Sequence, residues 1–174
     1  MSTKQTDAVN LHEINDRQTI TQLIYCYCRS VDRIDPALGH SIWNEGSIAD
    51  YGDFYRGDGP GVIDLICQQH RHTLYHSHQV SNIIIELEGN HAGSEAYVTA
   101  NLRVKQGEHI KQMTVWSRYV DQWSRQDGRW GIDKRITIRD FDEVRDVVPL
   151  SQLETEGSRD YNDPSYTVLK RLMP

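Results

Sequence analysis

Residues 94–104, SEAYVTANLRV, decide the fold class that this chain is expected to adopt. Apolar side chains occupy the even positions of this stretch, and more polar ones occupy the odd positions. The alternation predicts a β-strand with one buried face, because successive side chains of a strand point to opposite sides. Three neighbouring segments have strand composition, and the hairpin-type turns EGNH, QGE and QDG separate the four. The predicted strands are 79–88, 93–106, 110–124 and 129–140.

The last of these strands is rich in residues that favour a buried face. The same alternation predicts that its inner face holds Trp130, Ile132, Ile136 and Ile138. Aromatic residues also alternate with polar ones in the strand before it. We expect core or subunit-interface packing for Trp116, Tyr119, Trp123 and Trp130.

The first half of the chain has the periodicity of helices. Apolar residues recur every three or four positions up to Ile34, after a good capping residue at Asn15 or Asp16. The Asp35-Pro36 step ends this pattern, because proline disfavours helical geometry in the residue before it. The predicted elements are helices over 15–34, 36–43 and 60–76, with a loop and one short strand over 49–61. Helices followed by an antiparallel sheet indicate an α+β fold with the helices on one face.

Length and composition restrict the class of protein. The chain has 174 residues and a net charge of −6, which predicts one domain and argues against binding to duplex nucleic acid. The apolar runs are far shorter than the ~18 residues that a membrane span needs. Residues 1–10 are polar and lack a secretory signal, so we expect a cytoplasmic protein whose three cysteines are structural thiols.

The chain divides into three parts on this pattern. Residues 1–12 are predicted to form a flexible leader, and residues 13–148 the folded domain. Residues 149–174 form a polar tail with a short helix predicted over 165–172, lying over a pocket or on the surface.

Asp32 is the first candidate for chemistry. It lies near the end of the first predicted helix, where the helix dipole disfavours a carboxylate. Solvent, an arginine (Arg29 or Arg33) or a cationic group across the fold must compensate the charge. An exposed surface aspartate explains the pattern equally well, and helix position alone does not choose between them.

Four histidines, His70, His72, His76 and His78, run from the second long helix into the first strand. The four-residue spacing of His72 and His76 suits a zinc site on a helix, although a solvated helix end is the favoured interpretation. His78 differs, because it has the same strand parity as Val80, Asn82 and Ile84. A buried histidine held by a carboxylate keeps a fixed tautomer and acts as a base near neutral pH.

Several short motifs extend this interpretation to a family. In order, they are YCRSVDR (27–33), DYG (50–52), HQVSN (78–82), RY (118–119) and WGIDKR (130–135). In order and spacing, residues 14–140 resemble the SnoaL-like branch of the nuclear-transport-factor-2-like superfamily. That branch includes scytalone dehydratase, bile-acid 7-alpha-dehydratase and lindane dehydrochlorinase.

The resemblance implies a fold and a set of site residues. The fold is a cone-shaped barrel, in which a strongly curved mixed or antiparallel sheet packs against N-terminal helices around a central pocket. Asp32 and His78 match the Asp–His dyad of the lyase members, with His76 as a competing base. By the same resemblance, the other catalytic candidates are Tyr27, Tyr51 and Arg135, and the substrate-binding candidates are Asn82, Trp43, Val80 and Arg139.

The resemblance also implies an activity. We expect a lyase of the dehydratase type that needs no cofactor or metal and acts on a hydrophobic cyclic or aromatic molecule. Isomerisation, cyclisation and cofactor-free deformylating carbon–carbon cleavage begin with the same proton transfer and remain alternatives. A non-catalytic role, as in the small subunits of ring-hydroxylating dioxygenases, is the third class. A homodimer or homotrimer is expected, without a nucleic-acid or membrane partner.

Overall fold

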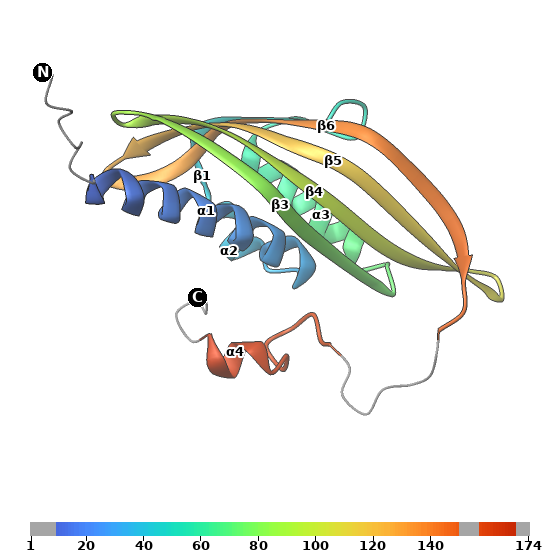
Figure 1. Cartoon of the computed structure of the whole chain (residues 1–174). Coiled ribbons are helices and arrows are strands. Elements are labelled where there is room, and N and C mark those ends of the chain that lie inside the picture. Colours follow the sequence, from blue (N-terminus) through green and yellow to red (C-terminus); the bar gives the residue numbers. More distant parts are fainter. Residues whose placement is uncertain (1–9, 150–156, 170–174) are drawn as a thin grey trace, which may run out of the picture.

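The computed structural model describes residues 10–149 and 157–169 of the chain. Three helices precede or interrupt the first strands, and four long strands follow (Figure 1). The elements are α1 (Leu11–Asp32), α2 (Pro36–His40), β1 (Trp43–Asp50), β2 (Arg56–Gly57), α3 (Gly59–His70), β3 (Tyr75–Glu88), β4 (His91–Gln106), β5 (His109–Gln126), β6 (Arg129–Val147) and α4 (Ser165–Val168). None of the described helices is long and apolar enough to cross a membrane.

The strands form one six-stranded sheet in the order β2-β1-β6-β5-β4-β3. The pairing of β1 with β6 is parallel, and the other pairings are antiparallel. The sheet curls over α1, α2 and α3, which lie on its concave side (Figure 1). The α+β cone fold is therefore confirmed, but the sheet does not close into a barrel, because β2 and β3 remain as edges.

The core lies between the helices and the concave face of the sheet. Ile20 and Ile24 of α1 are fully buried there, as are Val62 and Ile63 of α3. From the sheet, the even positions of β4 point inward as predicted, and Ala96 is also fully buried. Burial of these faces fixes the long α1 against the strands that carry the candidate site.

The first helix begins earlier than predicted. Asn10 is its cap, with a side-chain oxygen that accepts hydrogen bonds from the backbone N–H of His12 and Glu13. The side-chain amide of Asn10 also donates to the Glu13 carboxylate, 2.9 Å away, which orients the capping side chain. Asp16 lies inside the helix instead and is buried beside Trp130. The predicted leader therefore overlaps α1, and residues 1–9 lie outside the described part.

A β-bulge in β3 changes which side chains of this strand point inward, so the predicted shared face of His78, Val80, Asn82 and Ile84 was wrong beyond Val80. The register shifts between Ser81 and Ile84, and Asn82 has a left-handed backbone with φ of 51°. The extra residue reverses the alternation, so that Asn82 and Ile84 are exposed and Ile85 is buried. His78 and Val80 lie before the bulge and keep the inward orientation.

A second shift, in the pairing of β5 with β6, has the same consequence. The register changes between Gln122 and Trp123, next to Asp133 of β6. Trp130 and Ile132 point inward as predicted, whereas Ile136 and Ile138 are more than one third exposed. These last two inward placements were wrong. The irregularity turns Arg135 inward instead.

Candidate functional site

Asp32 and His78 meet on the concave side of the sheet. The Oδ1 atom of Asp32 lies 2.7 Å from Nδ1 of His78, and Oδ2 accepts the backbone N–H of His78 at 3.0 Å. Their side chains are 18% and 10% exposed, so the contact is largely removed from solvent. The group that compensates Asp32 thus lies across the fold, and the alternative of a surface aspartate is excluded.

The local structure explains this meeting. Asp32 is the last residue of α1, and His78 lies on the inward side of β3, the strand that α1 packs against. The backbone N–H and the ring of one residue hold both carboxylate oxygens. Because Nδ1 faces the carboxylate, it carries a hydrogen, and the neutral ring keeps its lone pair on Nε2.

The dyad lines a cavity of about 330 Å³ between α1 and β3. This volume is within the range of small-molecule sites. The lining residues are Tyr25, Cys28, Arg29, Asp32, Arg33, His78 and Val80. Val80, predicted to bind substrate, is thus beside the dyad. Arg29 and Arg33 also lie at this cavity, although neither forms an ion pair with Asp32.

Tyr27, Tyr51 and Arg135 form a second cluster deeper in the cone. The hydroxyl oxygens of Tyr27 and Tyr51 lie 2.5 Å apart. Arg135 is fully buried and donates two hydrogen bonds to Asp121, each 2.7 Å long. Its guanidinium lies 4.1 Å and 3.9 Å from the ring centres of Tyr27 and Tyr119.

The electrostatics of this cluster are fixed. Burial raises the pKa of Tyr27 and Tyr51, so both hydroxyls stay protonated near neutral pH. Burial alone lowers the pKa of Arg135, but the Asp121 carboxylate outweighs it and raises the pKa well above the usual value. Nη1 of Arg135 has no hydrogen-bond partner of regular geometry among the described residues.

Cys28 lies between the dyad cavity and the Arg135 cluster. Its thiol lines the cavity, and burial raises its pKa to about 12. Arg135 opposes this shift, whereas Asp32 adds to it, because both charges act on the thiol. Cys28 is therefore a neutral thiol, and it does not supply a thiolate to the cavity.

Three other predicted residues have different positions. Trp43 joins the second cluster, with its ring centre 5.8 Å from the guanidinium of Arg135. Asn82 is exposed because of the bulge. The side chain of Arg139 is 71% exposed and pairs with Asp142 at 3.1 Å. The assignment of Asn82 and Arg139 to the pocket was wrong in this structure.

The remaining histidines do not form the helical pair considered for zinc. The helix α3 ends at His70, so His72 is exposed in a turn and His76 belongs to β3. His76 is buried, with Nε2 2.9 Å from the carbonyl oxygen of Val31 and Nδ1 2.9 Å from the Thr73 hydroxyl. Over residues 10–149 and 157–169, no group of three or more ligating side chains is arranged to hold a metal ion.

Asp121 is the buried group that the sequence interpretation missed. It has the strand parity of Tyr119 and Trp123, two aromatic residues expected in the core. A carboxylate on that face needs a cation, and Arg135 on the neighbouring strand supplies it. The parity of Asp121 was the available signal.

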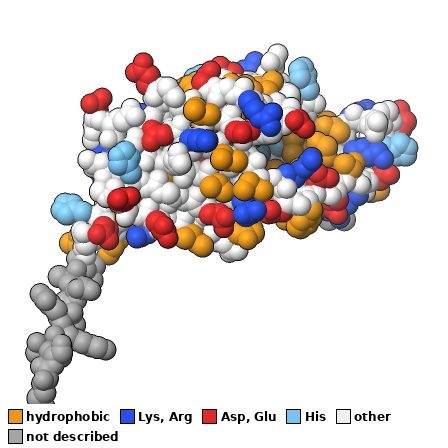
Figure 2. Space-filling view, turned by 90° about the horizontal axis from the view of Figure 1, so that it is seen from above, with side chains coloured by type: hydrophobic (Ala, Val, Ile, Leu, Met, Phe, Trp, Pro, Cys, Tyr) orange, Lys and Arg blue, Asp and Glu red, His pale blue; other side chains and the backbone are white. Residues whose placement is uncertain are grey.

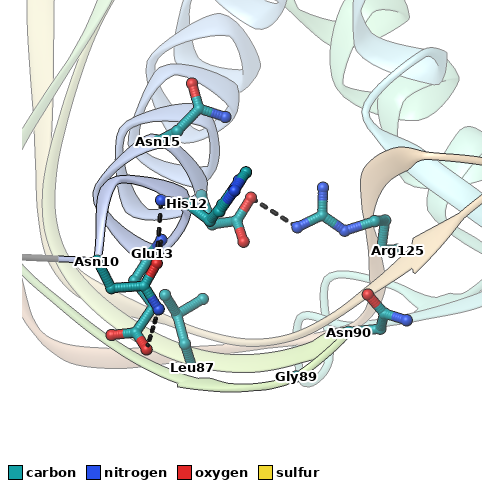
Figure 3. Close-up of a pocket in the computed structure, with 9 residues that line it drawn as sticks. Asn10, His12, Glu13, Asn15, Leu87, Gly89, Asn90 and Arg125 are labelled. Carbon is teal, nitrogen blue, oxygen red and sulfur yellow. Dashed lines mark hydrogen bonds and ion pairs between the residues drawn. The ribbon is translucent and has the colours of Figure 1, made fainter.

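A larger hollow lies at the other end of α1 (Figure 3). It measures about 450 Å³, and the ion pair of Arg125 with Asp16, 2.6 Å long, crosses it. Sixteen residues separate Asp16 from Asp32, about 24 Å along a helix at ~1.5 Å per residue. Two pairs of its polar side chains, Asn10 with Glu13 and Arg125 with Asp16, contact each other, and neither dyad residue lines this hollow.

Comparisons with known proteins agree with this architecture. A family model described as a SnoaL-like domain matches residues 12–136. A hexachlorocyclohexane dehydrochlorinase (LinA type 2) is 15% identical with a TM-score of 0.73, covering 83% of this chain and 99% of that chain. A search of curated protein sequences found no significant match.

Two structures from Novosphingobium aromaticivorans are similar as well. A putative scytalone dehydratase is 18% identical with a TM-score of 0.67, covering 82% of this chain and 97% of that chain. A putative aromatic ring hydroxylase is 22% identical with a TM-score of 0.66, covering 77% and 94% of the two chains. At these identities the likeness shows the fold alone.

Proposed function

The chain belongs to the SnoaL-like domain family, of the nuclear-transport-factor-2-like superfamily, and on that premise we propose that it is a cofactor-independent lyase of the dehydratase type. The observation that carries the proposal is the 2.7 Å contact of Asp32 with His78 at the wall of a small-molecule cavity. Structural neighbours that are named as dehydratases and dehydrochlorinases support a lyase scaffold.

In this mechanism His78 is the base. Asp32 holds the hydrogen of Nδ1, so Nε2 takes a proton from a carbon of the substrate that lies beside an electron-withdrawing group. As the ring becomes an imidazolium, the carboxylate stabilises its positive charge. Loss of hydroxide or halide from the adjacent carbon completes the elimination, and His78 returns the proton to solvent or to the leaving hydroxide.

The Arg135 cluster supplies positive potential behind the cavity. Its members do not line the dyad cavity, but the fixed cation and the neutral tyrosine hydroxyls lie on the inner side of it. We propose that this field stabilises the negative charge that develops on the substrate as the proton leaves. Direct contact of Tyr51 or Arg135 with the leaving group stays a prediction.

The substrate that we propose is a cyclic or aromatic small molecule of modest size. Isomerisation and carbon–carbon cleavage share the first proton transfer, so the product distinguishes them. A non-catalytic subunit is the competing class, favoured only by the similarity to a putative aromatic ring hydroxylase. Such a subunit has no activity alone, and its Asp32–His78 contact serves only stability.

The test is turnover by the purified chain without added metal or cofactor. Hexachlorocyclohexane, assayed by chloride release, and scytalone, assayed by absorbance, are the first substrates, because similar folds are named for these reactions. A fall in the elimination rate of about 10²–10⁴ in both His78→Ala and Asp32→Asn supports the proposal. Full activity in His78→Ala contradicts it.

We further propose that copies of the chain associate through the convex face of the sheet. Figure 2 shows hydrophobic side chains among charged ones on this face. Adjacent exposed residues here are Ile84, Tyr97, Ile136, Ile138 and Phe141. Arg118, in the same area, is already paired with Glu95 and Asp140, each 3.0 Å away. An apolar surface with neutralised charges favours self-association.

A further inference from the structure

Arg159 connects the C-terminal tail with the histidines behind the dyad. Its Nη1 lies 2.7 Å from the carbonyl oxygen of His70, 3.0 Å from Oγ1 of Thr73 and 3.4 Å from Nδ1 of His76. The family match ends at residue 136, so this contact is an addition to the matched domain.

The same tail segment binds both arginines that flank Asp32. Arg33 pairs with Asp163 at 3.7 Å, and Arg29 donates to the Ser165 hydroxyl at 3.1 Å. The guanidinium of Arg29 also lies over the Tyr166 ring, 4.8 Å from its centre. The tail therefore contacts the last turn of α1, which ends at Asp32, and the residue that follows it.

The hydrogen bonds of His76 determine its protonation. Nε2 faces the carbonyl oxygen of Val31 at 2.9 Å, and a carbonyl only accepts, so Nε2 carries the hydrogen. Nδ1 faces the Thr73 hydroxyl at 2.9 Å and the Arg159 guanidinium, which always donates. The Thr73 hydroxyl donates its hydrogen to the His70 carbonyl at 2.8 Å, so the donor that a proton on Nδ1 would meet is Arg159. Arg159 therefore favours the neutral ring with its lone pair on Nδ1.

Val31 links this ring to the dyad. Its carbonyl is among the last of α1, where no intrahelical N–H is available. The imidazole of His76 donates to it at 2.9 Å, and Nδ1 of His70 lies 3.2 Å from it. Two histidines thus hold the peptide that leads directly into Asp32.

Four charged or titratable groups face His76. They are Asp32 from α1, His70 from α3, His78 from the same strand and Arg159 from the tail. Burial lowers the pKa of His76 most, Arg159 and His78 lower it further, and Asp32 and the Val31 carbonyl raise it. The balance is a lowered pKa, in agreement with the neutral ring that the hydrogen bonds require.

We propose that Arg159 is a positioning residue for the Asp32–His78 dyad. By holding His76 neutral with its hydrogen on Nε2, Arg159 fixes the Val31 peptide and so the orientation of the Asp32 carboxylate. It acts through His76 and does not touch the substrate. The effect on catalysis rests on the proposed function. The contacts of Arg159 with His76, and of His76 with Val31, do not. It also assigns His76 a supporting role and leaves His78 as the base.

The test is imidazole nitrogen NMR on the full chain, with wild type compared with Arg159→Gln. We expect the pKa of His76 to rise when the Arg159 cation, 3.4 Å from Nδ1, is removed, because the guanidinium disfavours a second positive charge beside it. We also expect the proton between His78 and Asp32 to shift or broaden. With a substrate in hand, kcat falls by roughly ten- to a hundredfold at unchanged KM, the effect of a displaced catalytic pair.

Two further variants separate this role from simple docking of the tail. Arg159→Lys keeps the cation and restores the His76 titration, even if Arg159→Gln weakens the fold. Tyr166→Phe removes only the hydroxyl that donates to Asp35 at 3.4 Å, and it leaves the histidine signals unchanged. Equal effects in Tyr166→Phe and Arg159→Gln contradict a specific role for Arg159.

The outcomes also distinguish the two proposals. Unchanged His76 and His78 signals in Arg159→Gln overturn the positioning role, whatever the activity. Shifted signals in a chain that shows no elimination keep the positioning role and remove the proposed function.

Discussion

Two carboxylates on the concave side of the sheet are each paired with a nitrogen-containing side chain, and the two pairs differ in whether a proton can move. The Asp32–His78 pair is partly accessible from a cavity, and an imidazole can both accept and release a proton. The Asp121–Arg135 pair is fully buried, and its arginine stays charged. The first pair is therefore suited to proton transfer, and the second to a constant electric field.

The difference in solvent accessibility explains why the buried pair contains an arginine and the pair at the cavity contains a histidine. A buried arginine is tolerated only with a matched carboxylate, and the two parallel hydrogen bonds to Asp121 provide one. At the cavity, the Asp32 carboxylate is held by two hydrogen bonds from His78 and does not need a permanent cation. The comparison predicts that activity depends most on the dyad and stability most on the Arg135 pair.

Removing the dyad base is expected to have the largest effect. In His78→Ala, the rate of elimination falls by about 10²–10⁴, the contribution of a positioned general base. Asp32→Asn gives a loss of the same order, because the amide reverses the hydrogen bond to Nδ1. The measurement is kcat for chloride or water loss, with circular dichroism to confirm the fold.

His72→Ala is the matched control for this loss. His72 is exposed in the turn between α3 and β3, so its removal leaves kcat unchanged. A comparable fall of kcat in His72→Ala would show that the loss in His78→Ala comes from a structural change in residues 70–78 and not from removal of the base.

Breaking the buried pair is expected to affect stability more than chemistry. Arg135→Met leaves Asp121 buried without its cation, which costs about 3–5 kcal/mol in the free energy of unfolding. The double variant Arg135→Met, Asp121→Leu regains much of this loss, because neither charge remains. Urea unfolding of wild type, the single variant and the double variant measures the loss and the regain of stability. Equal stability of wild type and Arg135→Met would contradict the structural role given to the Asp121–Arg135 pair.

Sequence periodicity predicted the general fold, and the resemblance to a family predicted one of these two pairs. The period-two alternation in 94–104 and the helical spacing up to Ile34 indicate which faces meet in the core. The Asp–His assignment came from family motifs, since helix position left Asp32 open to two interpretations. The structure places the two side chains in contact.

The bulges explain what the patterns missed. One extra residue reverses the alternation, and neither Asn82 nor Asp133 carries a sequence signal strong enough to place it. As a result, Asn82 is exposed and does not face the pocket as predicted, and Ile136 is exposed and does not lie in the core as predicted. Arg135 turned inward by the same shift, although the prediction reached it through the family motif. The contacts of Arg159 depend on where the tail packs against the domain, and the hydrophobic periodicity of the sequence does not predict that position.

Acid is expected to destabilise the end of the molecule that holds the dyad, because a buried histidine there resists protonation. Burial lowers the pKa of His70 to about 4, while His76 and His78 lower it further and the Val31 carbonyl and Asp32 raise it. The unfolded chain therefore binds a proton that the folded chain excludes, and stability falls as pH decreases from about 6.5 to about 4. The loss from this group is on the order of 3 kcal/mol.

His70→Gln tests the assignment of this pH dependence. The glutamine does not titrate, so the acid slope of unfolding free energy between pH 6.5 and 4 becomes shallower than in wild type. Thermal unfolding across that range measures the slope. An unchanged slope would assign the acid sensitivity to other groups.

The smallest effect on stability is expected on the outer face of the sheet. Ile138 lies on the opposite side of β6 from Arg135 and is 36% exposed. A lysine here extends into solvent in the monomer, so Ile138→Lys changes the unfolding free energy by no more than about 0.5 kcal/mol. Neither interior pair is disturbed, because the sheet separates them from the new charge.

Self-association, by contrast, depends on this position. If copies of the chain pack through the convex face, a buried lysine without a carboxylate partner prevents assembly. Sedimentation then shows a monomer for Ile138→Lys, while Glu88→Lys, at the far end of β3, retains the assembly of the wild type. A monomer that keeps full activity would show that both interior pairs are complete within one chain. Loss of activity on dissociation would show that the dyad depends on a partner copy. The contrast between the Asp32–His78 and Asp121–Arg135 pairs would then hold only for the assembled protein.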